Sequence, residues 1–198
     1  MANTLAPFGF KLVSGGMGAS PNFELVKAKI LYSNTTAMYH GDPVKMQSTG
    51  YIAQWTASTA VSQLWGIFHS CKYTSTSTGK ITNLPYWPGA DAVSGTVEAL
   101  LIPCVTAPAP LFVVQSSGTA LTQADVGANA DVSVGTGSTV GGYFSGATLD
   151  QGTLGTTATL PFRIVGLYEG AAGANGTDHA SSYNWVYVRA NVAGTTGI

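Results

Sequence analysis

Charge is the first thing that the sequence has little of. Only 9% of the residues are Asp, Glu, Lys or Arg, compared with roughly 25% in ordinary globular domains. The formal net charge is −1, so the composition indicates no basic surface of the kind that binds nucleic acid or anionic membranes. A protein with so little charge has weak protection against association, which favours one that works within an assembly.

Long apolar runs are also absent. No stretch of the chain reaches the roughly 18 consecutive apolar residues of a membrane-spanning helix. Residues 1–16, MANTLAPFGFKLVSGG, have neither the basic start nor the continuous apolar centre of a secretion signal. The sequence therefore predicts no membrane partner.

Cysteine is rare. Cys71 and Cys104 both lie in strand-like segments, which predicts free thiols buried in the core. A disulfide between them stays open, because two sequence positions do not fix the distance between their Cα atoms. A chain of this length buries enough surface to fold without a disulfide or a metal.

Motifs for catalysis, metals and nucleotides are missing as well. His40, His69 and His179 are far apart in the sequence, and none has a second ligand at the spacing of a metal site. The glycines of residues 135–142, GTGSTVGG, do not have the spacing of a dinucleotide-binding loop. We therefore expect no metal, no cofactor and no enzymatic activity.

His69 and Cys71 form the one pair that resembles a catalytic site in composition. They are two residues apart, so on a strand they would share a face. A catalytic thiol and its base usually come from separate elements and need a third group that orients the base. We expect a packed thiol beside a histidine at the edge of the core.

Glycine, with 25 residues, and Ser, Thr and β-branched residues are abundant. They disfavour helices and favour strands and turns. The sequence predicts an all-β fold, a single β-barrel or a β-sandwich of jelly-roll or tulip-like form, with strands covered on both faces or closed into a barrel. The expected strands cover residues 23–32, 43–47, 51–55, 64–73, 95–105, 111–116, 161–169 and 183–192.

We expect residues 1–22 to form an extended N-terminal arm and residues 23–198 to form the β domain. The apolar residues of the arm follow no helical or strand periodicity, so the arm is expected to be loosely held in the free protein and ordered on a partner. The alternative is an edge strand on the protein's own barrel. The arm residues that would contact the partner are Leu5, Pro7, Phe8, Phe10 and Leu12.

Four parts of the β domain are expected to lie outside its regular strands. Residues 135–159 are rich in Gly and Thr and predict a long excursion or an edge hairpin. Residues 170–182 predict a flexible loop, and residues 193–198 a flexible tail. Residues 122–130 predict a short helical turn, because Thr122 can cap it and Asp125 favours its dipole.

Residues 62–90, SQLWGIFHSCKYTSTSTGKITNLPYWPGA, pass from apolar to polar to aromatic. We interpret residues 65–73 as a core strand and residues 73–80 as an exposed polar loop. Tyr86 and Trp87 stand between two prolines, which fix the backbone, so they predict a rigid aromatic knob that anchors a neighbouring subunit. The alternative is that Trp87 only closes the end of the barrel.

The segments described so far resemble a family of tailed-phage head proteins, the capsid decoration or cement proteins. Seven segments carry the resemblance, in the family's order and over nearly the whole chain, although this chain is less acidic than those relatives. They are MANTLAPFGFKLV (1–13), YHGDPVKM (39–46), WGIFHSCKYTSTSTGKITNLPYWPGA (65–90), LFVVQSSG (111–118), ADVGANADV (124–132), LPFRIVGLYEG (160–170) and NVAGTTGI (191–198).

The resemblance implies a non-enzymatic virion protein on the outer surface of an icosahedral head. Its partner would be the major capsid protein, whose neighbouring subunits it would cement. It would also associate with itself, as a trimer on a threefold axis or, alternatively, a dimer on a twofold axis. The alternative function is an adhesion or carbohydrate-binding module on the virion, with Tyr86 and Trp87 stacking on sugars.

Overall fold

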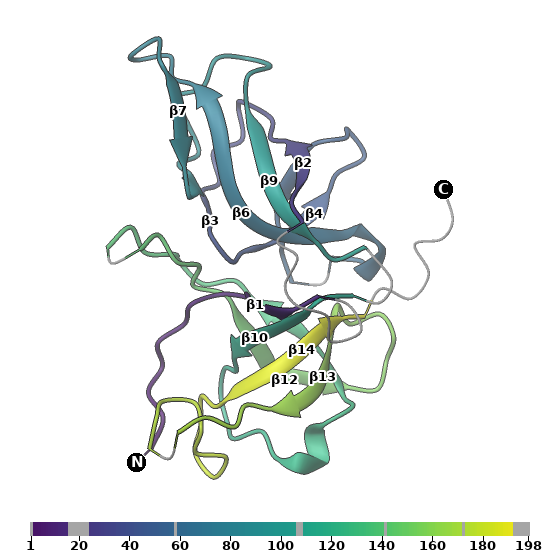
Figure 1. Ribbon diagram of the computed structural model, residues 1–198. Coiled ribbons are helices and arrows are strands. Elements are labelled where there is room, and N and C mark those ends of the chain that lie inside the picture. The colour runs from purple at the N-terminus through teal and green to yellow at the C-terminus, as the bar shows by residue number, and fades with distance from the viewer. Residues whose placement is uncertain are drawn as a thin grey trace.

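The computed structural model describes residues 2–15, 24–57, 59–105, 109–140, 142–171 and 173–191. Figure 1 shows two β-lobes, one above the other. The first residues of the chain run up the side of the lower lobe and end in a strand at the junction of the two lobes.

The upper lobe is built on an antiparallel sheet in the order β2-β9-β6-β4-β5, with β7 paired to the outer part of β6. The sheet curls so that its two ends approach each other, as a bridge between Ile30, just after β2, and Ile52 of β5 shows. A two-stranded ribbon of β3 and β8 lies against β6. The bounds are β2 (Val26–Lys29), β3 (Met38–Tyr39), β4 (Pro43–Met46), β5 (Ile52–Gln54), β6 (Leu64–Thr74), β7 (Ile81–Leu84), β8 (Tyr86–Trp87) and β9 (Glu98–Pro103).

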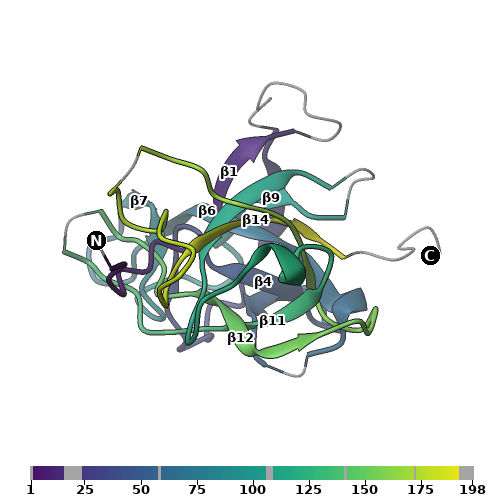
Figure 2. The ribbon, with the colours of Figure 1, turned by 90° about the horizontal axis from the view of Figure 1, so that it is seen from below.

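The lower lobe is a second antiparallel sheet, in the order β1-β10-β14-β13-β11-β12. It also curls, because Ser116, just after β10, bridges to Leu149 of β12. Figure 2 shows β11, β12 and β14 across the underside of the molecule. The bounds are β1 (Lys11–Ser14), β10 (Leu111–Gln115), β11 (Asn129–Ser133), β12 (Thr148–Gly155), β13 (Phe162–Leu167) and β14 (Trp185–Ala190).

Two hydrophobic cores lie on opposite faces of the upper sheet. The larger core joins the two lobes, because Leu64 and Ile67 of β6 pack with Phe112 and Val188 of the lower sheet. The smaller core contains Phe68 of β6 and is covered by the β3–β8 ribbon. Apolar residues at consecutive positions of β6 are therefore buried on both faces, as its sequence predicts.

The all-β fold is confirmed, in a sandwich-like form and without a closed barrel. All eight expected strands are present, mostly shorter than expected. The helical turn is a single 3-10 turn over Gln123–Asp125, capped by Thr122. The Gly/Thr-rich excursion ends in β12, an edge strand of the lower sheet. The flexible tail expected at residues 193–198 lies outside the described residues.

The prediction of a loosely held arm is wrong for its described part, residues 2–15. Lys11–Ser14 form β1, which pairs with β10 at the edge of the lower sheet. Phe10 is 1% exposed and packs against Phe112 and Phe162 in the larger core. The apolar spacing of residues 1–22 did not reveal this strand, because only Lys11–Ser14 have strand conformation. Gly9, at a φ of +72°, changes the direction of the chain just before them.

Hydrogen bonds fasten the start of the arm to the rest of the lower lobe. The side chain of Asn3 accepts from the backbone N–H of Gly176 at 2.8 Å and donates to the carbonyl of Asp178 at 2.9 Å. The buried amide of Gln115 accepts from the N–H of Ala6 at 2.8 Å and donates to the carbonyl of Thr4. The loop that was expected to be flexible is therefore hydrogen-bonded to the arm at Gly176 and Asp178.

Candidate functional site

A groove opens on the lower face of the upper sheet, where that face extends past the larger core. It consists of a cavity of about 600 Å³ and an adjoining one of about 220 Å³, which share His40 and His69. We call this feature the histidine groove. Its lining residues are Phe10, Lys11, Leu12, Leu25, Lys27, His40, His69, Ser70, Cys71, Lys72, Asn83, Leu84, Pro85, Glu98, Leu100 and Ile102.

A β-bulge in β6 sets the position of His69. Phe68 pairs with Leu101 and Ser70 with Leu100, which leaves His69 as the extra residue between them. Such a bulge re-aims a side chain and reverses the alternation of faces beyond it. His40 comes from the turn between β3 and β4, and its Nδ1 lies 2.9 Å from the carbonyl oxygen of His69. The two imidazole rings meet edge to face, with centroids 4.9 Å apart.

The outer wall of the histidine groove is a stripe of charged residues across three strands. Glu98 of β9 is paired with Lys29 of β2 on one side and with Lys72 of β6 on the other. Lys29 donates a hydrogen bond to Glu98 at 3.2 Å. This hydrogen bond and the charges of Lys29, Lys27 and Lys72 hold the pKa of Glu98 below its usual value.

Positive charge therefore exceeds negative charge in the histidine groove. Its lining includes Lys11, Lys27 and Lys72 but only one carboxylate, that of Glu98. Burial lowers the pKa of His69, and the neighbouring His40 lowers it further. The neutral form of His69 is therefore favoured, and the positive charge of the groove comes from its lysines.

The histidines have some but not all of the partners that catalysis would require. Ser70 Oγ lies 3.2 Å from Nδ1 of His69, within reach of a proton transfer. Among the described residues, however, no carboxylate is hydrogen-bonded to either imidazole. The same part of the chain contains no group of three or more His, Cys, Asp or Glu that could hold a metal ion.

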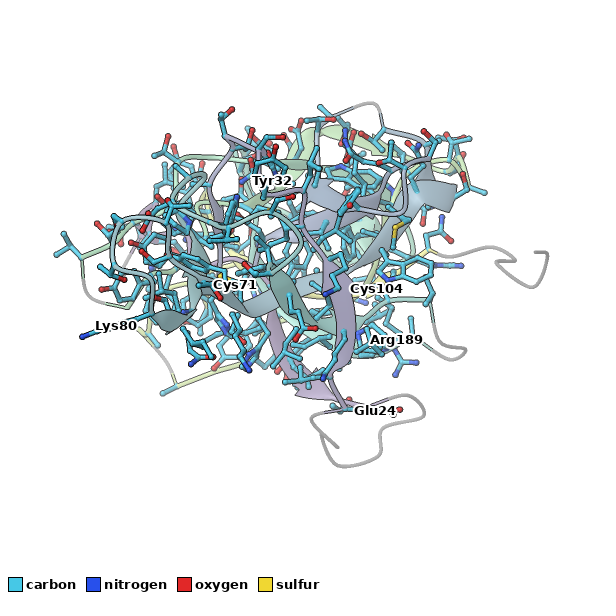
Figure 3. The ribbon with its side chains drawn as sticks, turned by 90° about the horizontal axis from the view of Figure 1, so that it is seen from above. Glu24, Tyr32, Cys71, Lys80, Cys104 and Arg189 are labelled. Atoms are coloured by element: carbon cyan, nitrogen blue, oxygen red, sulfur yellow. The ribbon has the colours of Figure 1, made fainter. Side chains whose placement is uncertain are left out.

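The prediction of free, buried thiols is confirmed. Cys71 and Cys104 are both buried and unpaired, and Figure 3 shows them in separate parts of the molecule. Burial raises the pKa of Cys71 to about 12. Burial also raises the pKa of Cys104 above its usual value. Cys71 Sγ donates to the carbonyl of Tyr86 at 3.2 Å, away from the partners of His69. Both side chains line the larger cavity, but the imidazole and the thiol have different hydrogen-bond partners.

The prediction of an exposed aromatic knob is wrong for Trp87. Trp87 is 0% exposed and packs edge to face against Tyr73 in the smaller core. Its indole N–H donates to the carbonyl of Asn34 at 3.1 Å. Tyr86 is half-buried and stacks on Tyr39 and on Tyr143, with centroids 5.7 and 4.8 Å apart. Trp87 is therefore a core residue of the upper lobe, and Tyr86 is part of a stack of three tyrosines.

The five arm residues expected at an interface have different surroundings. Phe10 belongs to the larger core and Leu12 packs against it. Phe8 contacts Trp185 edge to face at 4.7 Å, and Pro7 is half-buried. Leu5 is 56% exposed, so it is the arm residue best placed to meet a partner.

A buried carboxylate beside the groove is a feature that sequence patterns do not indicate. Asp42 is 0% exposed and accepts hydrogen bonds from the backbone N–H of Tyr39, from Gln54 and from the hydroxyl of Ser145. Burial raises its pKa, although these hydrogen bonds oppose the shift. Asp42 thereby joins the β3–β4 turn, the edge strand β5 and the excursion before β12. Its sequence neighbours His40 and Gly41 are not large apolar residues, so the local sequence did not predict that Asp42 is buried.

The polar loop at 73–80 is held by a second carboxylate. Asp91 accepts hydrogen bonds from the hydroxyls of Ser75, Thr76 and Ser77 and from the backbone N–H of Ser77, at 2.6 to 2.9 Å. The hydrogen bonds from Ser75 and Thr76 contribute most to lowering its pKa. Residues 76–80 are exposed, as predicted, whereas Tyr73 and Ser75 are buried and β6 extends to Thr74.

Comparisons with known proteins found no matching family model, no matching curated protein and no matching solved structure. Within the described ranges, no helix is long and apolar enough to cross a membrane.

Proposed function

We propose that the chain is a decoration protein, which binds the outer surface of an icosahedral phage head and cements neighbouring subunits of the major capsid protein. The sequence resemblance over nearly the whole chain supports this proposal. The structure adds a surface that is poor in charge and presents isolated large apolar side chains, a composition found in protein interfaces.

The observation that carries the proposal is the position of these apolar side chains. Leu5 on the arm is 56% exposed, Ile81 at the start of β7 is 64% exposed, and Val140 in the excursion before β12 is 85% exposed. Figure 1 shows the excursion projecting from the side of the molecule, below β7. Each extension offers one small contact, and linked weak contacts raise overall affinity through effective concentration.

The alternative, a carbohydrate-binding module, loses its two expected contact residues. Trp87 is buried, and Tyr86 stacks on two other tyrosine rings. A sugar would need a free aromatic face, which neither ring offers in this arrangement. We therefore favour the structural role, with a trimer on a threefold axis as the expected assembly and a dimer as the alternative.

The test is to look for the protein in purified particles of the phage that encodes it. We expect mass spectrometry to find it in a fixed ratio to the coat protein, and image reconstruction to place it on the outer surface between coat subunits. Its absence from particles, or a position inside the head or in the tail, would overturn the proposal. A glycan array that gives specific binding would favour the alternative.

A further inference from the structure

The charge of the histidine groove sets it apart from the rest of the protein. Its lining residues carry three lysines and one glutamate, a formal charge of +2, whereas the whole chain carries −1. The remainder of the molecule therefore carries −3. In a chain with only eight Lys and Arg, this concentration of lysines around one groove is a specific feature of the surface.

The shape and the lining chemistry of the histidine groove fit an extended peptide. Its two cavities share His40 and His69, so a bound segment can run from one cavity past the imidazoles into the other. Leu84, Pro85 and Leu100 provide apolar surface, and Asn83 and Ser70 provide hydrogen-bonding groups between them. A strand-like segment presents side chains to alternate sides, so it can place acidic groups toward the lysines and apolar groups toward the leucines.

We propose that the histidine groove binds an extended acidic segment of a partner protein, with carboxylates paired to Lys27 and Lys72. This inference rests on the proposed function, within which the segment would belong to the coat protein. Electrostatic complementarity of this kind steers encounter and fixes the register of the bound segment. The single Glu98 is already hydrogen-bonded to Lys29, so Lys27 and Lys72 are the cations that a ligand would meet in the larger cavity.

Fluorescence anisotropy tests the proposal on the isolated protein. The probe is a labelled ten-residue peptide that alternates Asp and Val, and the matched control peptide alternates Lys and Val. We expect the Asp peptide to bind and the Lys peptide not to bind. The double variant Lys27→Gln/Lys72→Gln should bind the Asp peptide about tenfold more weakly, since two charge pairs are lost.

A matched variant separates the groove from the overall charge. Lys45→Gln/Lys80→Gln makes the same charge change on the same lobe, at lysines that do not line the groove. We expect it to bind the Asp peptide as wild type does. Equal losses in the two double variants, or no binding of the Asp peptide by wild type, would overturn the proposal. Binding of dextran sulfate with the same affinity and lysine dependence would show a general polyanion site and would also overturn it.

A head-binding assay distinguishes this inference from the proposed function. If the protein binds heads but Lys27→Gln/Lys72→Gln binds them equally well, the groove proposal is wrong and the decoration role stands. If the protein does not bind heads at all, the decoration role is wrong, and the peptide measurement still decides whether the groove takes acidic segments.

Discussion

The indole N–H of Trp55 in the upper lobe donates a 2.9 Å hydrogen bond to Oδ1 of Asp131 in the lower lobe. Trp55 is 1% exposed and Asp131 is 7% exposed, so the bond lies at the buried junction of the two sheets. Asp131 Oδ1 also accepts from the backbone N–H of Val132. The junction is therefore fixed by a directional contact as well as by apolar packing.

Replacing this tryptophan should weaken the junction. We expect Trp55→Phe to lower the free energy of unfolding by roughly 1–3 kcal/mol, because Asp131 Oδ1 loses one of its two donors and some packing volume is lost. Chemical denaturation monitored by circular dichroism would measure it. Trp65→Phe, at a half-buried position of β6, is the control and should cost less. Equal costs would show that the bond to Asp131 contributes nothing.

Removing the arm should unfold the lower lobe. Deletion of residues 2–14 removes β1 and Phe10, so we expect a strongly lowered Tm or no folded protein. Phe10→Ala alone should cost about 3–5 kcal/mol, as for other large core residues. Leu5→Ala, an exposed position of the same arm, should change stability by less than about 0.5 kcal/mol. A truncated protein that melts like wild type would show that the arm is dispensable for the fold.

The buried carboxylate predicts a pH-dependent stability. The pKa of Asp42 is raised in the folded state, so its contribution is present at acid pH and is lost as pH rises through that pKa. We expect Asp42→Asn to gain stability relative to wild type as the pH is raised from 4 to 8. Asp42→Ala should instead cost roughly 1–3 kcal/mol, because its donors are left unpaired. Thermal unfolding across this range would measure both, and a pH-independent difference for Asp42→Asn would contradict the assignment.

The histidine pair predicts the opposite dependence. The pKa of His69 is lowered in the folded state, so the unfolded chain takes up a proton first as pH falls below the ordinary histidine value of about 6.5. Stability from this group is therefore lost between about pH 6.5 and the lower folded pKa. His69→Asn should flatten this part of the stability curve. If the stability of this variant falls below pH 6.5 as steeply as that of wild type, the loss of stability at acid pH comes from another group.

Head binding should respond to Leu5 and not to Trp87. We expect Leu5→Asp to keep the wild-type Tm and to bind heads about tenfold more weakly, equivalent to about 1.4 kcal/mol. Trp87→Phe should lower the Tm, because it opens space in the smaller core, but its folded fraction should bind heads as wild type does. Sedimentation of heads with added protein would measure both. The reverse pattern would place the interface at the β3–β8 ribbon.

The strands that sequence patterns predicted are those with apolar or β-branched residues at successive or alternating positions, such as Leu64–Thr74. The missed strands are β1, β3, β7, β8, β11 and β12. All but β12 have five residues or fewer, and β12, TLDQGTLG, is mostly polar. They are held by pairing with distant segments, which local composition does not encode.

The candidate site was less predictable for a related reason. His40 and His69 meet only because a bulge and a turn bring separate segments together, and the three lysines of the histidine groove come from three strands, β1, β2 and β6. The alternation of Lys27 and Lys29 with apolar residues was the one local sign of a charged sheet face. Trp87 was misplaced because prolines beside an aromatic residue restrict the backbone without indicating which way the ring points.

The strand order of the lower sheet determines when during synthesis that sheet can form. The strands of the upper sheet come from one continuous stretch, residues 26–103, but β1 must wait for β10 and β14, about 100 and 170 residues later. Domains generally fold as they leave the ribosome, so the upper lobe is complete while its lower face, with Leu64 and Ile67, is still uncovered. We expect the growing chain to be most prone to aggregation in this interval, and its final folding step to be the pairing of the last strand, β14, with β10, which also holds β1.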